Sequence, residues 1–140
     1  MVNQKELQEK ILTYRILQAR LDGAMKQRDL VAKKMFELQS SLSSLEEMGK
    51  TDGDILFSLG SEAHAFGKPT NKGKIIVEVG ANVAIEKTLE EGKTVLNKRK
   101  DEFEKALTEI EAEISQLSAT IEEMTPELQN MIQKSQQQAG

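Results

Sequence analysis

The sequence has 140 residues, of which 38% are hydrophobic, 30% are charged and only 4% are aromatic, and the net charge is −4. So few aromatic side chains are unusual for a compact globule and favour long amphipathic helices. Charges of both signs are interspersed, which argues against a nucleic-acid binder, and the absence of cysteine excludes disulfides and thiolate chemistry. No uncharged run approaches the roughly 18 residues that span a bilayer. The N-terminus has no apolar stretch typical of a secretory signal, so we expect a soluble, cytoplasmic protein with no membrane partner.

Residues 1–49 predict a first coiled-coil helix. One heptad position holds Leu7, Tyr14, Leu21, Met35 and Leu42, and the other holds Ile11, Met25 and Ala32 together with Gln18 and Gln39. After Met35 the apolar residues move to Leu38, Leu42, Leu45 and Met48, which predicts a local change of register. Arg28 falls on the seam, where it could set the register; the interpretation we favour is that it snorkels toward glutamates of the partner helix.

Residues 50–87 predict two β-hairpins, because six of the nine glycines fall between Gly49 and Gly80 and short apolar runs alternate with turns. The predicted strands are 55–59, 62–66, 74–79 and 83–86. Alternation places one apolar set on a common face: Ile55, Phe57, Leu59, Ile75, Val77, Val79, Val83 and Ile85. Two such hairpins are marginal alone in water, so we expect this set to be the interface with other subunits.

Residues 88–134 predict the second coiled-coil helix. A seven-residue repeat runs through Leu89, Leu96, Phe103, Ile110, Leu117, Met124 and Met131, with Leu107, Ile114, Ile121 and Leu128 interleaved. Pro126 lies inside the pattern and removes one backbone hydrogen bond, which is either a tolerated bend or the cause of a mobile helix end. Residues 135–140 form a polar tail that we expect to be disordered.

Two helices of equal length around a central insertion favour an antiparallel pair. Residue 11 is then expected near residue 128, and residue 45 near residue 93. A parallel homodimer is the alternative, but it would leave the second helix without a partner. The expected fold class is therefore α+β, with a long antiparallel two-helix coiled coil, two central hairpins and a single domain over 1–140.

No residue constellation predicts an enzyme, a cofactor or a metal site. Gly92-Lys93-Thr94 lacks the glycine five residues earlier that a phosphate-binding loop needs, and Lys87 stands there. His64 is the only histidine. Glu62 is nearby, but there is no second histidine and no cysteine, and a metal site would need more ligands. We interpret His64 as a strand or surface residue.

The order of long helix, two hairpins and long helix resembles the alpha class of the prefoldin family. The motifs that carry the likeness are Ile55 to Gly60, Ile75 to Gly80 and Val83 to Thr88, with Met124 to Leu128 near the end of the second helix. Ser58 departs from the proline that the family often has in the first strand. The resemblance implies an ATP-independent holdase in which alpha subunits join beta-class subunits in a heterohexamer. The hairpins would form intersubunit β-barrels, and the coiled-coil tips would capture unfolded proteins for a group II chaperonin.

If that resemblance holds, the client-binding residues are the apolar ones at the tips of the coiled coil. We call this set the tip residues: Leu7, Ile11, Leu12, Met124, Leu128, Met131 and Ile132. Terminal turns can fray, and methionine adapts to varied partners. Met124, Leu128 and Met131 also fit ordinary seam packing, whereas Leu12 and Ile132 lie off the seam. The competing hypothesis is a structural or adaptor protein whose hairpins are an oligomerisation hub and whose coiled coil binds no client.

Overall fold

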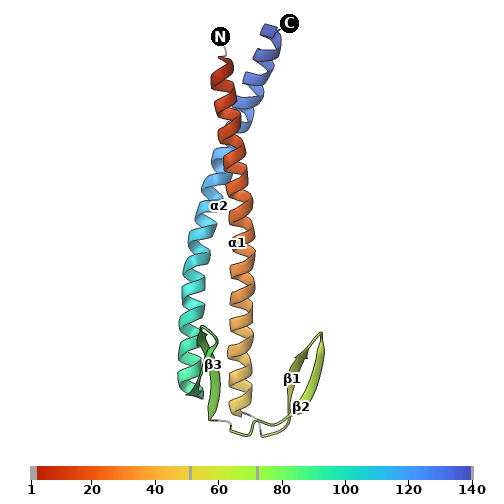
Figure 1. Cartoon of the computed structure of the whole chain (residues 1–140), viewed down its shortest axis with the longest axis vertical. Coiled ribbons are helices and arrows are strands. Elements are labelled where there is room, and N and C mark those ends of the chain that lie inside the picture. The colour runs from red at the N-terminus through yellow and green to blue at the C-terminus, as the bar shows by residue number, and fades with distance from the viewer. Residues whose placement is uncertain (1–2, 51, 72, 140) are drawn as a thin grey trace. The chain divides into compact units, whose positions relative to one another are not determined.

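The computed structural model describes residues 3–50, 52–71 and 73–139, and its elements follow the predicted order. They are helix α1 (Gln4–Lys50), strands β1 (Ile55–Gly60), β2 (Ala63–Gly67), β3 (Lys74–Gly80) and β4 (Val83–Thr88), and helix α2 (Leu89–Ala139) (Figure 1). The chain divides into two units, Met1–Ala32 with Lys105–Gly140 and Lys33–Glu104. The first holds a part of each helix, and the second holds the remaining part of each helix together with the four strands.

Side-chain caps explain where both helices begin. The Asn3 side-chain oxygen accepts a hydrogen bond from the Lys5 amide at 2.9 Å, and the Thr88 hydroxyl accepts one from the Glu91 amide at 3.2 Å. Each cap satisfies a backbone donor that has no partner inside the helix. Acidic residues in the first turns, Glu6 in α1 and Glu91 in α2, also complement the positive end of the helix dipole.

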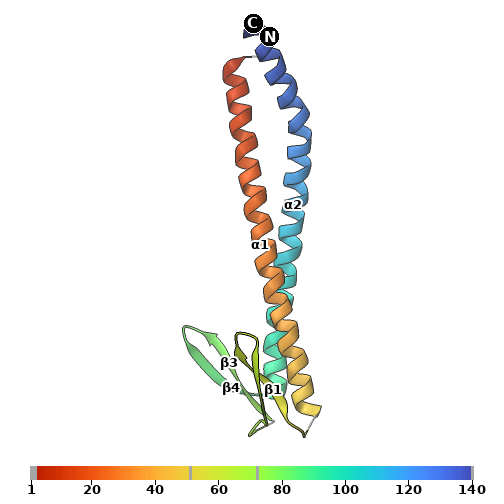
Figure 2. The same cartoon turned by 90° about the vertical axis from the view of Figure 1, so that its right-hand side faces the viewer.

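In each unit α1 and α2 run antiparallel (Figure 1 and Figure 2). In the first unit Ile11 and Leu128 line one groove, as expected. In the second, Leu45 and Leu96 line a common groove, and Glu46 and Lys93 line another. The predicted antiparallel pairing is therefore confirmed in both units.

The seam of α2 is confirmed, because every residue of its predicted repeat is buried or half-buried. The second seam position of α1 was predicted one residue too late, since Met25 is 40% exposed whereas Ala24 is 6% exposed. The second seam position follows the first by three residues rather than four along the whole helix. The predicted local change of register after Met35 is therefore not needed. The residues that take the position are Leu17, Ala24, Val31, Leu38 and Leu45.

Two smaller expectations about the helices are corrected. The Arg28 guanidinium forms an ion pair with the neighbouring Asp29 at 3.3 Å, rather than with a glutamate of α2. The expected tail is helical as far as Ala139, and the Gln4 side-chain amide donates a hydrogen bond to the Ser135 hydroxyl at 2.8 Å. Glutamine, lysine and alanine are good helix formers, so a polar sequence of this kind can remain helical.

The strands form two separate two-stranded antiparallel sheets, β1–β2 (the first hairpin) and β3–β4 (the second hairpin). Both hairpins turn through two residues with positive φ, Ser61 and Glu62 in the first and Ala81 and Asn82 in the second. Each turn follows a glycine with positive φ, Gly60 or Gly80, where the pairing register shifts by a bulge. Glycine adopts this conformation without the steric cost that other residues carry.

Candidate functional site

The tip residues lie in a part of the coiled coil that polar contacts between α1 and α2 hold together. The contacts join residues far apart in sequence, so they fix the register of the two helices. Besides the Gln4–Ser135 bond they are Tyr14 Oη to Thr125 Oγ1 at 3.2 Å, Arg20 Nη2 to Glu113 Oε1 at 3.3 Å, and an ion pair between Lys10 and Glu127.

The Lys10–Glu127 pair lies one turn before the tyrosine–threonine contact. The hydrogen bond from the Lys10 ammonium to the Glu127 carboxylate raises the pKa of Lys10. Both side chains are accessible to water, so the pair is of the surface kind and contributes modestly. Its main effect is on the alignment of the two helices.

The structure divides the tip residues into packed and accessible ones. Leu7 and Leu128 are 7% and 6% exposed, so both belong to the seam. The exposed members are Leu12 at 60% and Ile132 at 39%, as expected for residues off the seam. The half-buried members are Ile11, Met124 and Met131. Only part of the predicted set is therefore accessible when the helices are paired.

A groove of about 350 Å³ brings three of the tip residues together. Ile11 lines it from α1, and Leu128 and Ile132 line it from α2. The rest of its lining is Tyr14, Arg15, Gln18, Thr125 and Gln129. Leu7, Leu12, Met124 and Met131 do not line this groove. The arrangement offers an apolar floor with a polar rim, which suits weak contact with varied apolar groups.

Pro126 lies beside this groove, and α2 continues through it. Because proline has no amide hydrogen, the Glu122 carbonyl loses its usual helical donor. The preceding Thr125 hydroxyl donates to the Ile121 carbonyl at 2.8 Å and contacts the Tyr14 hydroxyl. The Thr125 hydroxyl therefore forms hydrogen bonds within α2 and to α1, next to the missing backbone hydrogen bond.

The predicted interface residues fall into two groups. Val77 is 6% exposed and Ile75 is half-buried, because both pack on α2 of the same chain. A β-carbon added at Gly92 would overlap the end of the Ile75 side chain and lie 3.9 Å from Val77 Cγ2. In the second group Ile55 is half-buried. The other five residues are exposed: Phe57, Leu59, Val79, Val83 and Ile85. Whether this surface meets other subunits stays a prediction.

Three exposed apolar residues were missed because they lie on the opposite face from the predicted set. Leu56 and Phe66 are cross-strand partners in the first hairpin and are 60% and 79% exposed, and Ile76 of the second hairpin is 74% exposed. The signal was present in the sequence. Ile55-Leu56-Phe57 and Ile75-Ile76-Val77 are unbroken apolar runs, which indicate apolar side chains on both faces of a strand.

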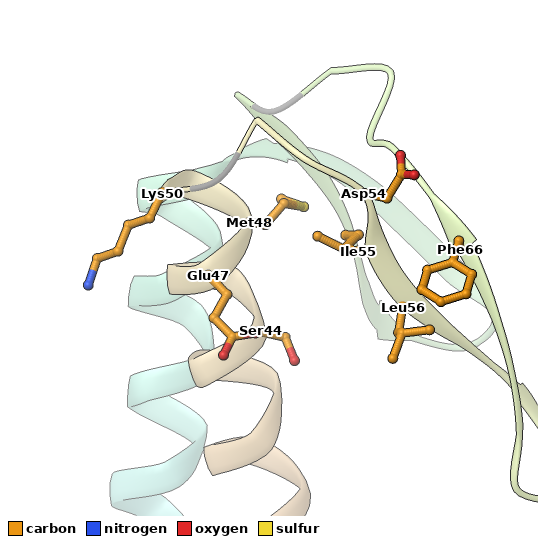
Figure 3. Close-up of a pocket in the computed structure, with 8 residues that line it drawn as sticks. All are labelled: Ser44, Glu47, Met48, Lys50, Asp54, Ile55, Leu56 and Phe66. Carbon is orange, nitrogen blue, oxygen red and sulfur yellow. The ribbon is translucent and has the colours of Figure 1, made fainter.

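The first hairpin and the end of α1 enclose a groove of about 580 Å³ (Figure 3). Met48 of α1 and Ile55 of β1 point toward one another across it, and Leu56 and Phe66 line its outer part (Figure 3). Polar residues form the rim: Ser44, Glu47, Lys50 and Asp54. This is a second accessible apolar surface, and it belongs to the hairpin that does not pack on α2.

Within residues 3–50, 52–71 and 73–139 no cluster of three or more histidine, aspartate or glutamate side chains could hold a metal ion. His64 is exposed on β2 opposite Ser58, which confirms its interpretation as a strand residue. Across the same described residues no helix is long and apolar enough to cross a bilayer.

Comparison with known proteins gives consistent matches. The Prefoldin family, described as "Prefoldin subunit", matches residues 17–134. Prefoldin subunit alpha of Pyrococcus horikoshii is 29% identical over 108 residues, which cover 75% of this chain and 73% of the relative. A chain in the cryo-EM structure of filamentous PFD from Methanocaldococcus jannaschii aligns with a TM-score of 0.66 and 23% identity, over 86% of this chain and 98% of the other. This structural likeness concerns the fold.

Proposed function

The chain belongs to the prefoldin family, and we propose that it acts as an alpha-class subunit that holds unfolded proteins at its coiled-coil tips without ATP. Prefoldin subunits are chaperones and not enzymes, which agrees with the absence of a catalytic constellation in the sequence. Members of the family assemble into multi-subunit complexes. The proposal concerns how this chain assembles, where it holds a client and what it does with the client afterwards.

Assembly is assigned to the hairpins, with beta-class subunits completing a heterohexamer. Each hairpin is a two-stranded sheet with open edges and exposed apolar side chains, which is an unfavourable state in water. If hairpins of neighbouring subunits paired into barrels, the strand edges would be hydrogen-bonded and the exposed apolar side chains would be buried. The whole chain then works as one prefoldin-like domain, in which 50–87 is the oligomerisation body.

Client capture is assigned to the tip residues. The observation that carries this proposal is the exposure of Leu12 and Ile132, which project from the coiled coil although both are large and apolar. Each such side chain gains about 1.5–3 kcal/mol when it is fully buried, so each contact is weak. Several tips in one assembly would bind a client more tightly by acting together. Release needs no nucleotide, only competition by a group II chaperonin in the cytoplasm.

The experiment compares a Leu12→Ser/Ile132→Ser double variant with the unaltered chain, each assembled with beta-class subunits. The readout is light scattering from several unrelated denatured proteins that are diluted into buffer without ATP. We expect the double variant to need about tenfold more assembly for equal protection, because two apolar contacts are lost. The matched control is Phe36→Ser, since Phe36 is 74% exposed on α1 outside the tip.

Native mass spectrometry establishes that all three assemblies have the same composition. If the double variant and the Phe36→Ser control protect equally well, the tips are not the capture site. If the unaltered assembly protects none of the denatured proteins and instead retains one defined native partner, the adaptor hypothesis replaces the holdase.

A further inference from the structure

The groove of about 350 Å³ between α1 and α2, which we call the tip groove, carries charge of one sign. Arg15 is in its lining, and none of the described residues that line it is acidic. The chain as a whole has 23 acidic residues against 19 basic ones and a net charge of −4. The tip groove is therefore a cationic site on an anionic chain, which favours an acidic occupant.

Arg15 is not neutralised by the chain itself. Over the part of the chain that the structure describes, its guanidinium forms neither an ion pair nor a hydrogen bond with another residue. Glu127 of α2 is paired with Lys10 and does not line the tip groove. Arg20, the next arginine of α1, pairs with Glu113 at 3.3 Å. The charge of Arg15 is thus available to a group outside the chain.

The other polar groups of the tip groove are neutral. The hydroxyls of Tyr14 and Thr125 share a hydrogen bond at 3.2 Å, so they are occupied with one another. The side-chain amides of Gln18 and Gln129 complete the polar lining. A guanidinium only donates hydrogen bonds, and its strongest acceptors are carboxylates and phosphates. Because the occupant under the proposed function is an unfolded polypeptide, the acceptor that matches Arg15 is a carboxylate.

The size of the tip groove suits a short extended segment. On α1 its lining runs from Ile11 to Gln18, which at about 1.5 Å per residue is a length of about 10 Å. An extended chain rises about 3.3 Å per residue, so about three residues pass along this length. A volume of about 350 Å³ is near the lower limit of ligand pockets, so the tip groove takes individual side chains rather than a folded element.

We infer that Arg15 makes the tip groove selective for extended client segments in which an aspartate or glutamate lies next to a large apolar residue. This inference rests on the proposed function and names the class of client segment. Ile11, Leu128 and Ile132 cover the apolar side chain, and the Arg15 guanidinium pairs with the carboxylate beside it. A lysine or arginine in place of the acidic residue meets like charge and is disfavoured. Arg15 is therefore the specificity-determining residue, and the apolar floor provides the larger part of the affinity.

The test uses the full chain and three unstructured peptides that differ only in the residue beside a central phenylalanine, which is glutamate, glutamine or lysine. Both peptide ends are blocked and the fluorophore is uncharged, so this residue carries the only variable charge. Fluorescence anisotropy gives the affinities. We expect the unaltered chain to bind the glutamate peptide about threefold more tightly than the glutamine peptide, as is typical of an exposed ion pair. The preference should decrease at high salt, which screens the pair.

Variants of the lining assign the preference to Arg15. Arg15→Gln should bind the glutamate and glutamine peptides equally and keep the affinity of the unaltered chain for the glutamine peptide. Arg15→Glu should prefer the lysine peptide by about threefold. The matched control is Lys33→Gln, which changes the net charge by the same amount as Arg15→Gln at an exposed position outside the lining. Ile132→Ser should weaken binding of the glutamate and glutamine peptides by the same factor, since it alters only the floor. Circular dichroism should show equal helicity for the Arg15 variants, because glutamine and glutamate are about as good helix formers as arginine.

Equal affinity of the unaltered chain for the glutamate and glutamine peptides would overturn the inference. A preference that Arg15→Gln retains, or that Lys33→Gln also removes, would overturn it too, because the preference would then not come from Arg15 in the tip groove. A fourth peptide has glutamine beside the phenylalanine and a free C-terminal carboxylate. Tighter binding of this peptide than of the glutamate peptide would show that chain ends, and not acidic side chains, are selected.

Light scattering with the same samples separates this inference from the proposed function. Protection of denatured proteins together with equal peptide affinities refutes only the selectivity of the tip groove. Absence of all protection and of all peptide binding refutes the proposed function, and this inference with it.

Discussion

The first and second hairpins have the same turn but differ in what covers them. Both have a glycine with positive φ followed by two residues in the left-handed region. In the second hairpin, Val77 is buried against α2. In the first, Phe57 and Leu59 are exposed, and Phe66 on the other face is 79% exposed. Two hairpins with the same turn conformation thus differ in packing: the second packs on α2 of its own chain, and the first has exposed apolar side chains.

The difference indicates how stability is divided in the second unit. Packing on α2 lets the second hairpin contribute to the folding of the single chain. Apolar residues on both faces of the first hairpin contribute little until another surface covers them. Substitutions in the second hairpin should therefore change the free energy of unfolding of the isolated chain, and substitutions in the first should change assembly.

The largest effect is expected for Val77→Asp. A carboxylate at a site that is 6% exposed loses most of its hydration, so the isolated chain should lose about 3 kcal/mol of unfolding free energy. Urea denaturation followed by circular dichroism measures this loss.

The matched control is Leu59→Asp, at a position that is 69% exposed in the first hairpin. It should change the unfolding free energy by less than about 0.5 kcal/mol and lower the native mass of the assembly with beta-class subunits. If Leu59→Asp destabilises the isolated chain as much as Val77→Asp, the two hairpins do not differ in the way described.

A smaller effect is expected for Gly92→Ala, which tests the close approach of β3 to α2. The new β-carbon would overlap Ile75 Cδ1 and lie 2.9 Å from Ile75 Cγ1. Overpacking typically costs about 1–3 kcal/mol, and the better helix propensity of alanine returns about 1 kcal/mol. We expect a net loss of about 1 kcal/mol in unfolding free energy, measured in urea.

Ile75→Val removes the atom that overlaps, so the double variant Gly92→Ala/Ile75→Val should recover most of that loss. Gly23→Ala is the control, since nothing lies within 4 Å of its new β-carbon, and it should raise stability by about 0.5–1 kcal/mol. Additive effects of Gly92→Ala and Ile75→Val would contradict a direct contact between the two sites.

These contacts also show what the sequence could and could not predict. The strands and the α2 seam were predictable because local signals, glycine turns and a strict seven-residue repeat, determine them. The second seam position of α1 was misassigned although its signal was present, because every residue of the correct set is apolar whereas the predicted set included Gln18 and Gln39. The helical end of α2 was expected to be disordered because its sequence is polar, although glutamine, lysine and alanine are good helix formers.

The candidate site was predictable to the extent that exposure follows the heptad. Leu12 and Ile132 lie off the seam and are exposed, as the pattern indicated. The exposed apolar residues on the other face of the hairpins were missed, because a strand with alternating residues was assumed to have one apolar face. Ile76 lies within an unbroken apolar run, so both faces of its strand are apolar. The role of Gly92 was hidden for a different reason. Gly92 and Ile75 are distant in sequence and become neighbours only when β3 packs on α2.

The smallest effect is expected for Arg99→Met, which tests whether α2 also holds β3 by its backbone. The Arg99 guanidinium donates a hydrogen bond to the Glu78 carbonyl at 2.6 Å, next to the bulge that precedes Gly80. Methionine keeps the apolar stem and removes the donor, so the unfolding free energy should fall by about 0.5–1.5 kcal/mol. Amide hydrogen exchange should then quicken in β3 and β4 and stay unchanged in β1 and β2, because α2 anchors only the second hairpin. Faster exchange in all four strands would mean that the hairpins open together, and the contrast between them would then concern exposure alone.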